Sequence, residues 1–188
     1  MQFYQVIDNR TSIKNFKSSP IDQGKLSRMV SASMNAPSWK NQTSYKMILV
    51  DDVNEKEKLA QAIENKDDTA ARSVREAPVT AVMVGDPSIS GVVDDKEYYL
   101  VDGAIAMEHF VLAATNEGYG SCWIAAFDEN KVKESLSIPN NYRVIAMTPI
   151  GEMEEQKEKY PEKDVRDHIF SNKWDNAYIT NSSELGIH

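Results

Sequence analysis

The spacing of apolar residues predicts helices at the start of the chain. From Phe3 to Arg10 they recur at helical intervals, so the N-terminus is expected to form a helix whose last turn carries the arginine. A second helix is expected from Leu26 to Ser33, because Asp22 is a start signal and Pro37 follows its end. The segment from Arg10 to Phe16 then lies between two helices.

Further along, short apolar runs bounded by turn residues predict strands at 46–50, 78–84, 122–124 and 144–150. Asn54 is expected to cap a helix that runs through Ala62, and Asp128 to cap a second short helix. The run 101–116 is mostly apolar all round and stops at Gly118, which is typical of a buried central helix. Helices and short strands without a regular βαβ alternation predict an α+β domain rather than a doubly wound one.

Composition narrows the class of protein. The 188 residues are 41% hydrophobic and 27% charged, which suits one globular domain. The net charge of −8 argues against a nucleic-acid partner, since phosphate-backbone recognition needs a basic face. The N-terminus does not resemble a secretory signal, and the longest apolar run is too short to span a bilayer. We therefore expect a cytoplasmic protein without membrane or nucleic-acid contacts.

The last part of the chain has a different pattern. After Gly151 an acidic loop leads to Arg166, then to an apolar cluster of Ile169, Phe170 and Trp174, and then to a polar tail. A long arm with aromatic residues and little core of its own is stable only against another surface. We expect a single domain spanning 1–188, in which about 152–188 form an extension that packs on a second subunit.

Arg10, Ser12 and Lys14 place two cations and a hydroxyl close together just past the first helix. In an extended segment alternate side chains share one side, so all three can face a single anion. The arginine would bind a phosphate bidentately and the serine would add a hydrogen bond. A solvated surface turn is the alternative from spacing alone.

Other polar and reactive residues do not by themselves indicate a binding or catalytic site. Residues 36–42 (APSWKNQ) form a turn by composition, which can also be no more than the end of a helix. Cys122, the only cysteine, has apolar neighbours and no histidine beside it, so a buried structural thiol is expected. The histidines at 109, 168 and 188 lack metal-ligand spacing, and no metal is predicted.

Four segments in their order along the chain resemble the nitroreductase family of flavoproteins. Residues 10–16 (RTSIKNF), 36–42 (APSWKNQ), 118–124 (GYGSCWI) and 139–146 (PNNYRVIA) follow the family patterns R-[RH]-S-x-[RK]-x-F, A-P-S-x-x-N-Q, G-x-G-S-C-W-I and P-x-x-Y-x-x-x-A. Each motif alone is weak, and their order across most of the chain carries the resemblance. It implies a nitroreductase-like α+β fold, with a central mixed or antiparallel sheet flanked by helices and a C-terminal arm over the partner subunit.

The resemblance also implies a homodimer that binds FMN at the subunit interface. Arg10 and Ser12 would hold the ribityl phosphate, and Lys14 would lie near the pyrimidine edge of the flavin. The 36–42 turn would reach the partner's flavin, and a backbone N–H after Ile124 would face flavin N5. Arg166 would return to the phosphate, with Lys163 assisting. The implied cofactor-binding residues are Arg10, Thr11, Ser12, Lys14, Pro37, Ser38, Trp39, Asn41, Asn65, Ile124, Ala125, Ala126 and Arg166.

Several positions depart from the family pattern. Thr11 stands where arginine or histidine is frequent, and Thr43-Ser44-Tyr45 follow Gln42 where the family has Pro-Trp. Ala125 and Ala126 replace a Gly-Gly pair. Asn65 stands farther than usual from the next strand, and a helix C-cap is its alternative interpretation.

The implied activity is that of an FMN-dependent oxidoreductase. Hydride would pass from NADH or NADPH through flavin N5 to a small planar acceptor, such as a nitroaromatic or a quinone, in a ping-pong mechanism without a catalytic side chain. A flavin-binding redox sensor or carrier with poor turnover is the alternative that the departures motivate. A specialised relative (a dehalogenase, an azoline oxidase or a flavin-degrading enzyme) and a flavin-free interaction domain are further alternatives.

Overall fold

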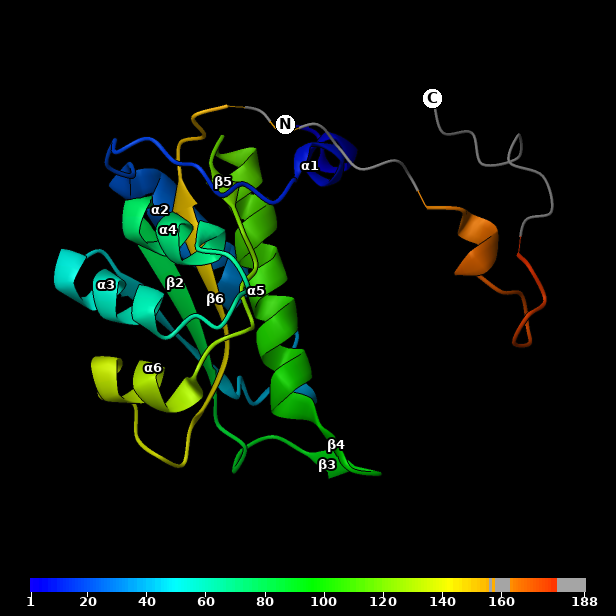
Figure 1. The fold of residues 1–188 in the computed structure, drawn as a ribbon. Helices are drawn as coiled ribbons and strands as arrows, with labels where there is room; N and C mark the ends of the chain where they lie inside the picture. The colour runs from blue at the N-terminus through cyan, green and yellow to red at the C-terminus, as the bar shows by residue number, and fades with distance from the viewer. Residues whose placement is uncertain (156, 158–162, 179–188) are drawn as a thin grey trace. The chain divides into compact units, whose positions relative to one another are not determined.

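The computed structural model describes residues 1–155, 157 and 163–178. The chain divides into two compact units, Met1–Lys157 and Glu158–His188. The first unit is built on a four-stranded sheet of order β1-β2-β6-β5, with every neighbouring pair antiparallel (Figure 1). The strands are β1 (Tyr45–Val50), β2 (Val79–Gly85), β5 (Gly120–Ser121) and β6 (Arg143–Gly151). The predicted α+β class is confirmed, with an antiparallel sheet.

One face of the sheet is covered by α2 (Gln23–Met34) and α5 (Tyr98–Asn116) (Figure 1). Met107 and Phe110 of α5 are fully buried in one core with Met83 and Ala146, which pair across β2 and β6. The expectation of a long central helix is therefore correct, and the helix begins three residues earlier than its apolar run.

The opposite face is covered by α3 (Val53–Gln61), α4 (Thr69–Glu76) and α6 (Glu129–Leu136) (Figure 1). Leu59, Val74 and Val132, one from each helix, are fully buried in a second core. Alternate residues of β2 therefore serve different cores: Val82 belongs to this one and Met83 to the other. Burial on both faces explains why β2 is apolar without alternation.

The smaller elements lie at the ends of these layers. They are α1 (Phe3–Asn9), the 3-10 turn η1 (Trp39–Asn41) and a hairpin of β3 (Val92–Val93) and β4 (Lys96–Glu97). Asp94 and Asp95 form the hairpin turn with positive φ, and this acidic pair is the exposed tip of the hairpin. The second unit contains η2 (Val165–Asp167) and a bridge between Phe170 and Ala177.

Capping side chains decide several boundaries. Asp22 accepts from the Lys25 amide and Asp128 from the Asn130 amide, as expected for these two N-caps. The prediction of Asn54 as a cap was wrong, because Asp52 is the N-cap of α3 and accepts from the Asn54 amide instead. The strand expected at 122–124 was also wrong in its bounds: β5 precedes it, and Ile124 forms only an isolated bridge to Met147.

Candidate functional site

The predicted phosphate-binding segment runs along the edge of the sheet. Ser12 forms a parallel bridge with Ser121, and the Ile13 amide donates to the Ser121 carbonyl at 2.8 Å. Ile13 is buried, while Ser12 and Lys14 on either side of it are half-buried and turn away from the core. The expected alternation is therefore present from Ser12 to Lys14.

Gly120 makes this arrangement possible. A Cβ on Gly120 would lie 2.8 Å from the Cβ of Ile13 and 2.7 Å from the Cγ of Met153, closer than packed side chains allow. The missing side chain of Gly120 therefore makes room for Ile13. Gly118 ends α5 with a φ of +87°, in open space.

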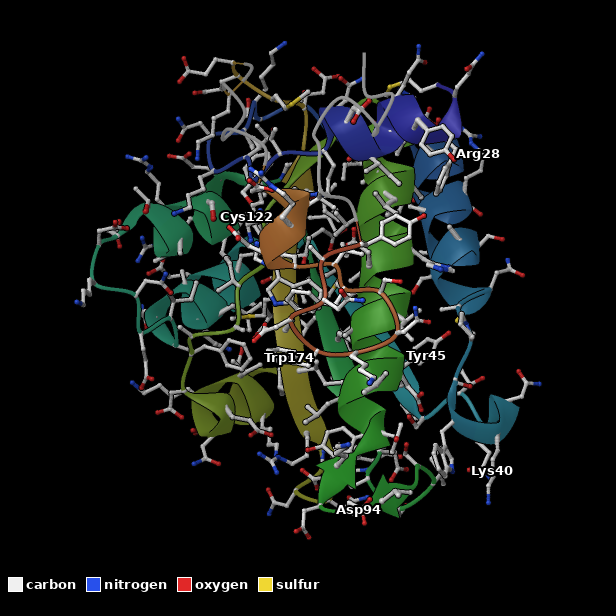
Figure 2. The ribbon with its side chains drawn as sticks, turned by 90° about the vertical axis from the view of Figure 1, so that its right-hand side faces the viewer. Arg28, Lys40, Tyr45, Asp94, Cys122 and Trp174 are labelled. Carbon is white, nitrogen blue, oxygen red and sulfur yellow. The ribbon has the colours of Figure 1, made fainter. Side chains whose placement is uncertain are left out.

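Positive charge gathers around this segment. Arg10 is the C-cap of α1, and its half-buried guanidinium forms no hydrogen bond or ion pair with a described residue. Burial raises the pKa of the Cys122 thiol, and the nearby charges of Lys14, Lys157 and Arg10 act in the opposite direction. Cys122 is thus the buried thiol that the sequence predicted, and Figure 2 labels its position.

The loop that precedes α4 closes one side of the same region. Lys14 Nζ donates to Thr69 Oγ1 at 3.3 Å. Asp67 accepts from the side chain and the amide of Thr69, and these hydrogen bonds, together with the charges of Lys14 and Arg72, keep the pKa of Asp67 below its ordinary value. Lys14 is therefore held in place by its neighbours.

Asn65 and the alanine pair lie on two segments that run side by side. Ile63 forms an antiparallel bridge with Phe127, and the Glu64 amide donates to the Ala126 carbonyl at 3.0 Å. This register places Asn65 opposite Ala125. The helix-cap interpretation of Asn65 was wrong, since α3 ends at Gln61 and its C-cap is Ala62.

Ile124 anchors the alanine pair to the sheet. It is buried and exchanges two backbone hydrogen bonds of 2.9 Å with Met147. Ala125 and Ala126 are exposed, and their N–H groups donate to no backbone carbonyl in the described part of the chain. The site therefore carries two free donors beside an exposed amide side chain.

The turn at residues 37–43 has an unusual backbone. Lys40, Asn41 and Thr43 all have positive φ, between 48° and 58°, although none is glycine. Pro37 and Asn41 are exposed, and Ser38 Oγ accepts from the Thr43 amide at 2.8 Å. Backbone strain of this kind persists only when the surroundings hold it, and it concentrates at functional sites.

The two groups of predicted residues lie at opposite ends of α5. The Trp39 amide donates to Asp102 near the start of the helix, whereas residues 10–14 pair with β5 beyond its end. From Asp102 to Asn116 the helix rises about 21 Å. Figure 2 shows the same separation, with Lys40 near the hairpin and Cys122 towards the other end. One copy of the chain therefore does not bring the two groups together.

Comparison with known proteins identifies the family of this chain. A sequence model of the Nitroreductase family matches residues 7–152. The chain belongs to the nitroreductase family. A crystal structure of a nitroreductase family protein from Clostridium novyi NT is 48% identical, with a TM-score of 0.82 over 97% of this chain and 99% of that one.

Two further family members are more distant. A structure described as an FMN-dependent nitroreductase from Clostridium difficile R20291 is 25% identical, with a TM-score of 0.78 over 90% of this chain and 98% of that one. A protein of Archaeoglobus fulgidus named "Putative NADH dehydrogenase/NAD(P)H nitroreductase" is 28% identical over 90% of this chain and 97% of its own length. The similarity thus extends over nearly the whole chain in both.

The remaining predicted site residue, Arg166, lies in the second unit. Its guanidinium binds Asp164, and hydrogen bonds from Arg166 hold the pKa of Asp164 at about 2. Lys163 is exposed. A role for Arg166 at the cofactor stays a prediction, as does the packing of about 152–188 on a second subunit.

Sequence reasoning missed two residues that shape the candidate site. Thr69 fixes Lys14, and Asp102 fixes the strained turn. Asp102 had a signal in the sequence, because an acidic residue inside an otherwise apolar helix must find partners when it is buried.

Among the described residues, no helix is long and apolar enough to cross a membrane, and no three His, Cys, Asp or Glu side chains form a potential metal site.

Proposed function

We propose that this chain is an FMN-dependent oxidoreductase that uses NADH or NADPH. The observation that carries the proposal is the edge segment Arg10–Lys14, in which a guanidinium without a partner among the described residues, a hydroxyl and a fixed ammonium lie beside β5. The FMN-dependent description of the Clostridium difficile relative and the NAD(P)H nitroreductase name of the Archaeoglobus relative support the cofactor and the electron donor.

The residues fit a flavin phosphate. Arg10 is free to form a bidentate contact, and Ser12 is half-buried next to it. Thr11 offers a second hydroxyl on the same segment. The backbone bridge from Ser12 to Ser121 holds these groups in place before a ligand arrives, which lowers the entropy cost of binding.

The flavin ring would lie towards Asn65 and the alanine pair. The unpaired N–H groups of Ala125 and Ala126 are donors that a ring nitrogen or carbonyl can use. Lys14 would offset the negative charge that a reduced flavin carries near its pyrimidine. When bound, FMN would accept hydride from the nicotinamide and deliver electrons to a nitroaromatic, quinone or similar acceptor in alternating half-reactions. No side chain of the site needs to act as acid or base.

A homodimer would complete the site. Pro37, Ser38, Trp39 and Asn41 would reach the flavin held by the partner, because they cannot reach the one held by their own chain. Leu100 and Val101 on the outer side of α5 are 43% and 45% exposed, and Phe3 and Tyr4 of α1 are more exposed still. Apolar area of this kind favours contact with a second copy.

The test is the visible spectrum of the purified chain on a size-exclusion peak, before and after NADH under nitrogen. Flavin bands that bleach on a dimer, and return with nitrofurazone or menadione, are the expected result. A colourless monomer that ignores added FMN would overturn the proposal. Rapid bleaching without reoxidation by either acceptor would favour a flavin carrier.

Arg10→Ala tests the phosphate contact itself. The variant should remain folded and dimeric but lose FMN, with affinity reduced at least tenfold, as expected for a charge-assisted contact. Arg28→Ala is the matched control, because Arg28 is an exposed arginine of α2 whose ion pair is with Glu117. Stoichiometric FMN in Arg10→Ala would remove Arg10 from the site.

A further inference from the structure

Asp102 is a buried carboxylate with an unusual set of partners. It lies in α5, is 2% exposed and has no basic residue among its hydrogen-bond partners. One oxygen accepts from the Trp39 amide at 2.7 Å, and the other accepts from Ser44 Oγ at 2.6 Å and from Ser90 Oγ at 3.3 Å. A carboxylate suits these positions because all three partners can donate.

The three donors come from three different segments that all lie against the start of α5. Trp39 and Ser44 bracket the residues with positive φ, so Asp102 fixes both ends of the strained turn. Ser90 belongs to the loop that leads into the β3–β4 hairpin. One side chain therefore joins the helix, the turn and the hairpin loop.

The Trp39 indole strengthens the same junction. It stacks on Tyr98 with ring centroids 4.4 Å apart. A Cβ on Gly91 would lie 2.3 Å from the indole, so only glycine allows the hairpin loop to approach this closely. The indole is thus enclosed by the hairpin on one side while its backbone is held by Asp102.

We propose that Asp102 is a positioning residue for cofactor binding: its carboxylate holds the turn at residues 38–43 in the arrangement that reaches the partner subunit's flavin. This inference rests on the proposed function, because the turn needs a flavin to reach. Loss of the carboxylate would release the strained backbone and leave the buried Ser44 hydroxyl, the half-buried Ser90 hydroxyl and the Trp39 amide without their acceptor. FMN would then bind to a site in which the partner subunit's turn at residues 38–43 is no longer held in place.

The experiment compares Asp102→Leu, which keeps the approximate volume, with Asp102→Asn, which keeps one acceptor and can donate to Ser44 Oγ. The measurements are amide hydrogen exchange of residues 38–44, the FMN dissociation constant and the kcat and KM for NADH. Asp102→Leu should exchange faster at the Trp39 amide, bind FMN about tenfold more weakly and show its kinetic defect at limiting FMN. Asp102→Asn should restore most of the FMN affinity.

Val132→Ala is the control for general destabilisation, because Val132 is fully buried in the core beneath α6, away from the turn. It should lower the melting temperature without changing FMN affinity. Asp102→Leu with wild-type exchange and wild-type FMN affinity would overturn the inference, as would Asp102→Asn that is no better than leucine. If the unaltered chain bound no FMN, the proposed function would fall and the cofactor role of Asp102 with it. Faster exchange in Asp102→Leu would then show only that the carboxylate orders the turn.

Discussion

Glu129 offers a test of how the candidate site is supported, because it lies in the first turn of α6 directly after the segment with Ala125 and Ala126. Its carboxylate accepts from Arg143 Nε at 3.0 Å and from the Val144 amide at 3.0 Å, and it lies 3.1 Å from Lys133 Nζ. Burial alone would raise the pKa of Glu129, but these hydrogen bonds and charges outweigh it and lower the pKa from 4.5 to about 2. The carboxylate therefore ties α6 to β6.

The contribution of Glu129 to the free energy of unfolding follows from the linkage between proton binding and folding. A fall from 4.5 to about 2 corresponds to roughly 3 kcal/mol at neutral pH, since each unit of pKa is worth about 1.4 kcal/mol. The Glu129 side chain is 24% exposed, so some solvent screening applies and about 2 kcal/mol is a better expectation. Because the folded-state pKa is depressed, this stability is fully present above about pH 4.5 and is lost as the pH falls towards 2.

Glu129→Gln should therefore lower the free energy of unfolding by about 2 kcal/mol at pH 7, measured by urea titration. The deficit relative to wild type should narrow by roughly 1 kcal/mol between pH 4.5 and pH 3.5. Glu134→Gln on the same helix is the control, because Glu134 is exposed and its side chain has no hydrogen bond or ion pair with a described residue. A deficit below about 0.5 kcal/mol at pH 7, or one that does not change with pH, would refute the reasoning.

Two further substitutions test packing. Gly120→Ala should push Ile13 from the sheet edge, destabilise the fold by about 1–3 kcal/mol and weaken FMN binding. Gly118→Ala should destabilise the fold through its positive φ alone and leave FMN affinity unchanged. Equal FMN affinity in the two variants, measured by flavin fluorescence, would contradict this expectation. Thr80→Val should raise the unfolding free energy by about 1 kcal/mol, because the Thr80 hydroxyl is buried in β2 without a hydrogen-bond partner among the described residues. A lower melting temperature in this variant would mean that the hydroxyl does form a hydrogen bond.

Much of the fold could be predicted because its signals are local. The N-caps Asp22 and Asp128 and the mostly apolar helix that stops before Gly118 need only neighbouring residues to be recognised. The cap of α3 was ambiguous, since Asp52 and Asn54 are both good capping residues two positions apart. Helix α4 was missed because its buried face is largely alanine, which gives a weak apolar pattern.

The candidate site was predictable only in its local features. The segment Arg10–Lys14 is extended as its pattern indicated, but its pairing with β5 was not predicted, because Ser12 and Ser121 are far apart in the sequence. Asp102 could be flagged as an acid in an apolar helix, but its partners could not, because Ser44 and Trp39 lie 58 and 63 residues away in the sequence. Such contacts are set by tertiary packing alone.

Two groups of predicted site residues, the turn at residues 37–43 and the segment Arg10–Lys14, lie at opposite ends of α5, and we call them the two half-sites. Their positions along α5 bear on the geometry of the proposed dimer. Homodimers commonly have a two-fold axis, which presents the same surface from both copies. If such an axis crosses α5 near its middle, the two copies of the helix run antiparallel, and the start of one helix then lies beside the end of the other. The strained turn of one copy would meet the Arg10–Lys14 segment of its partner, twice per dimer. The length of α5 separates the two half-sites within one chain, and the antiparallel pairing of two such helices would bring the half-sites of different chains together.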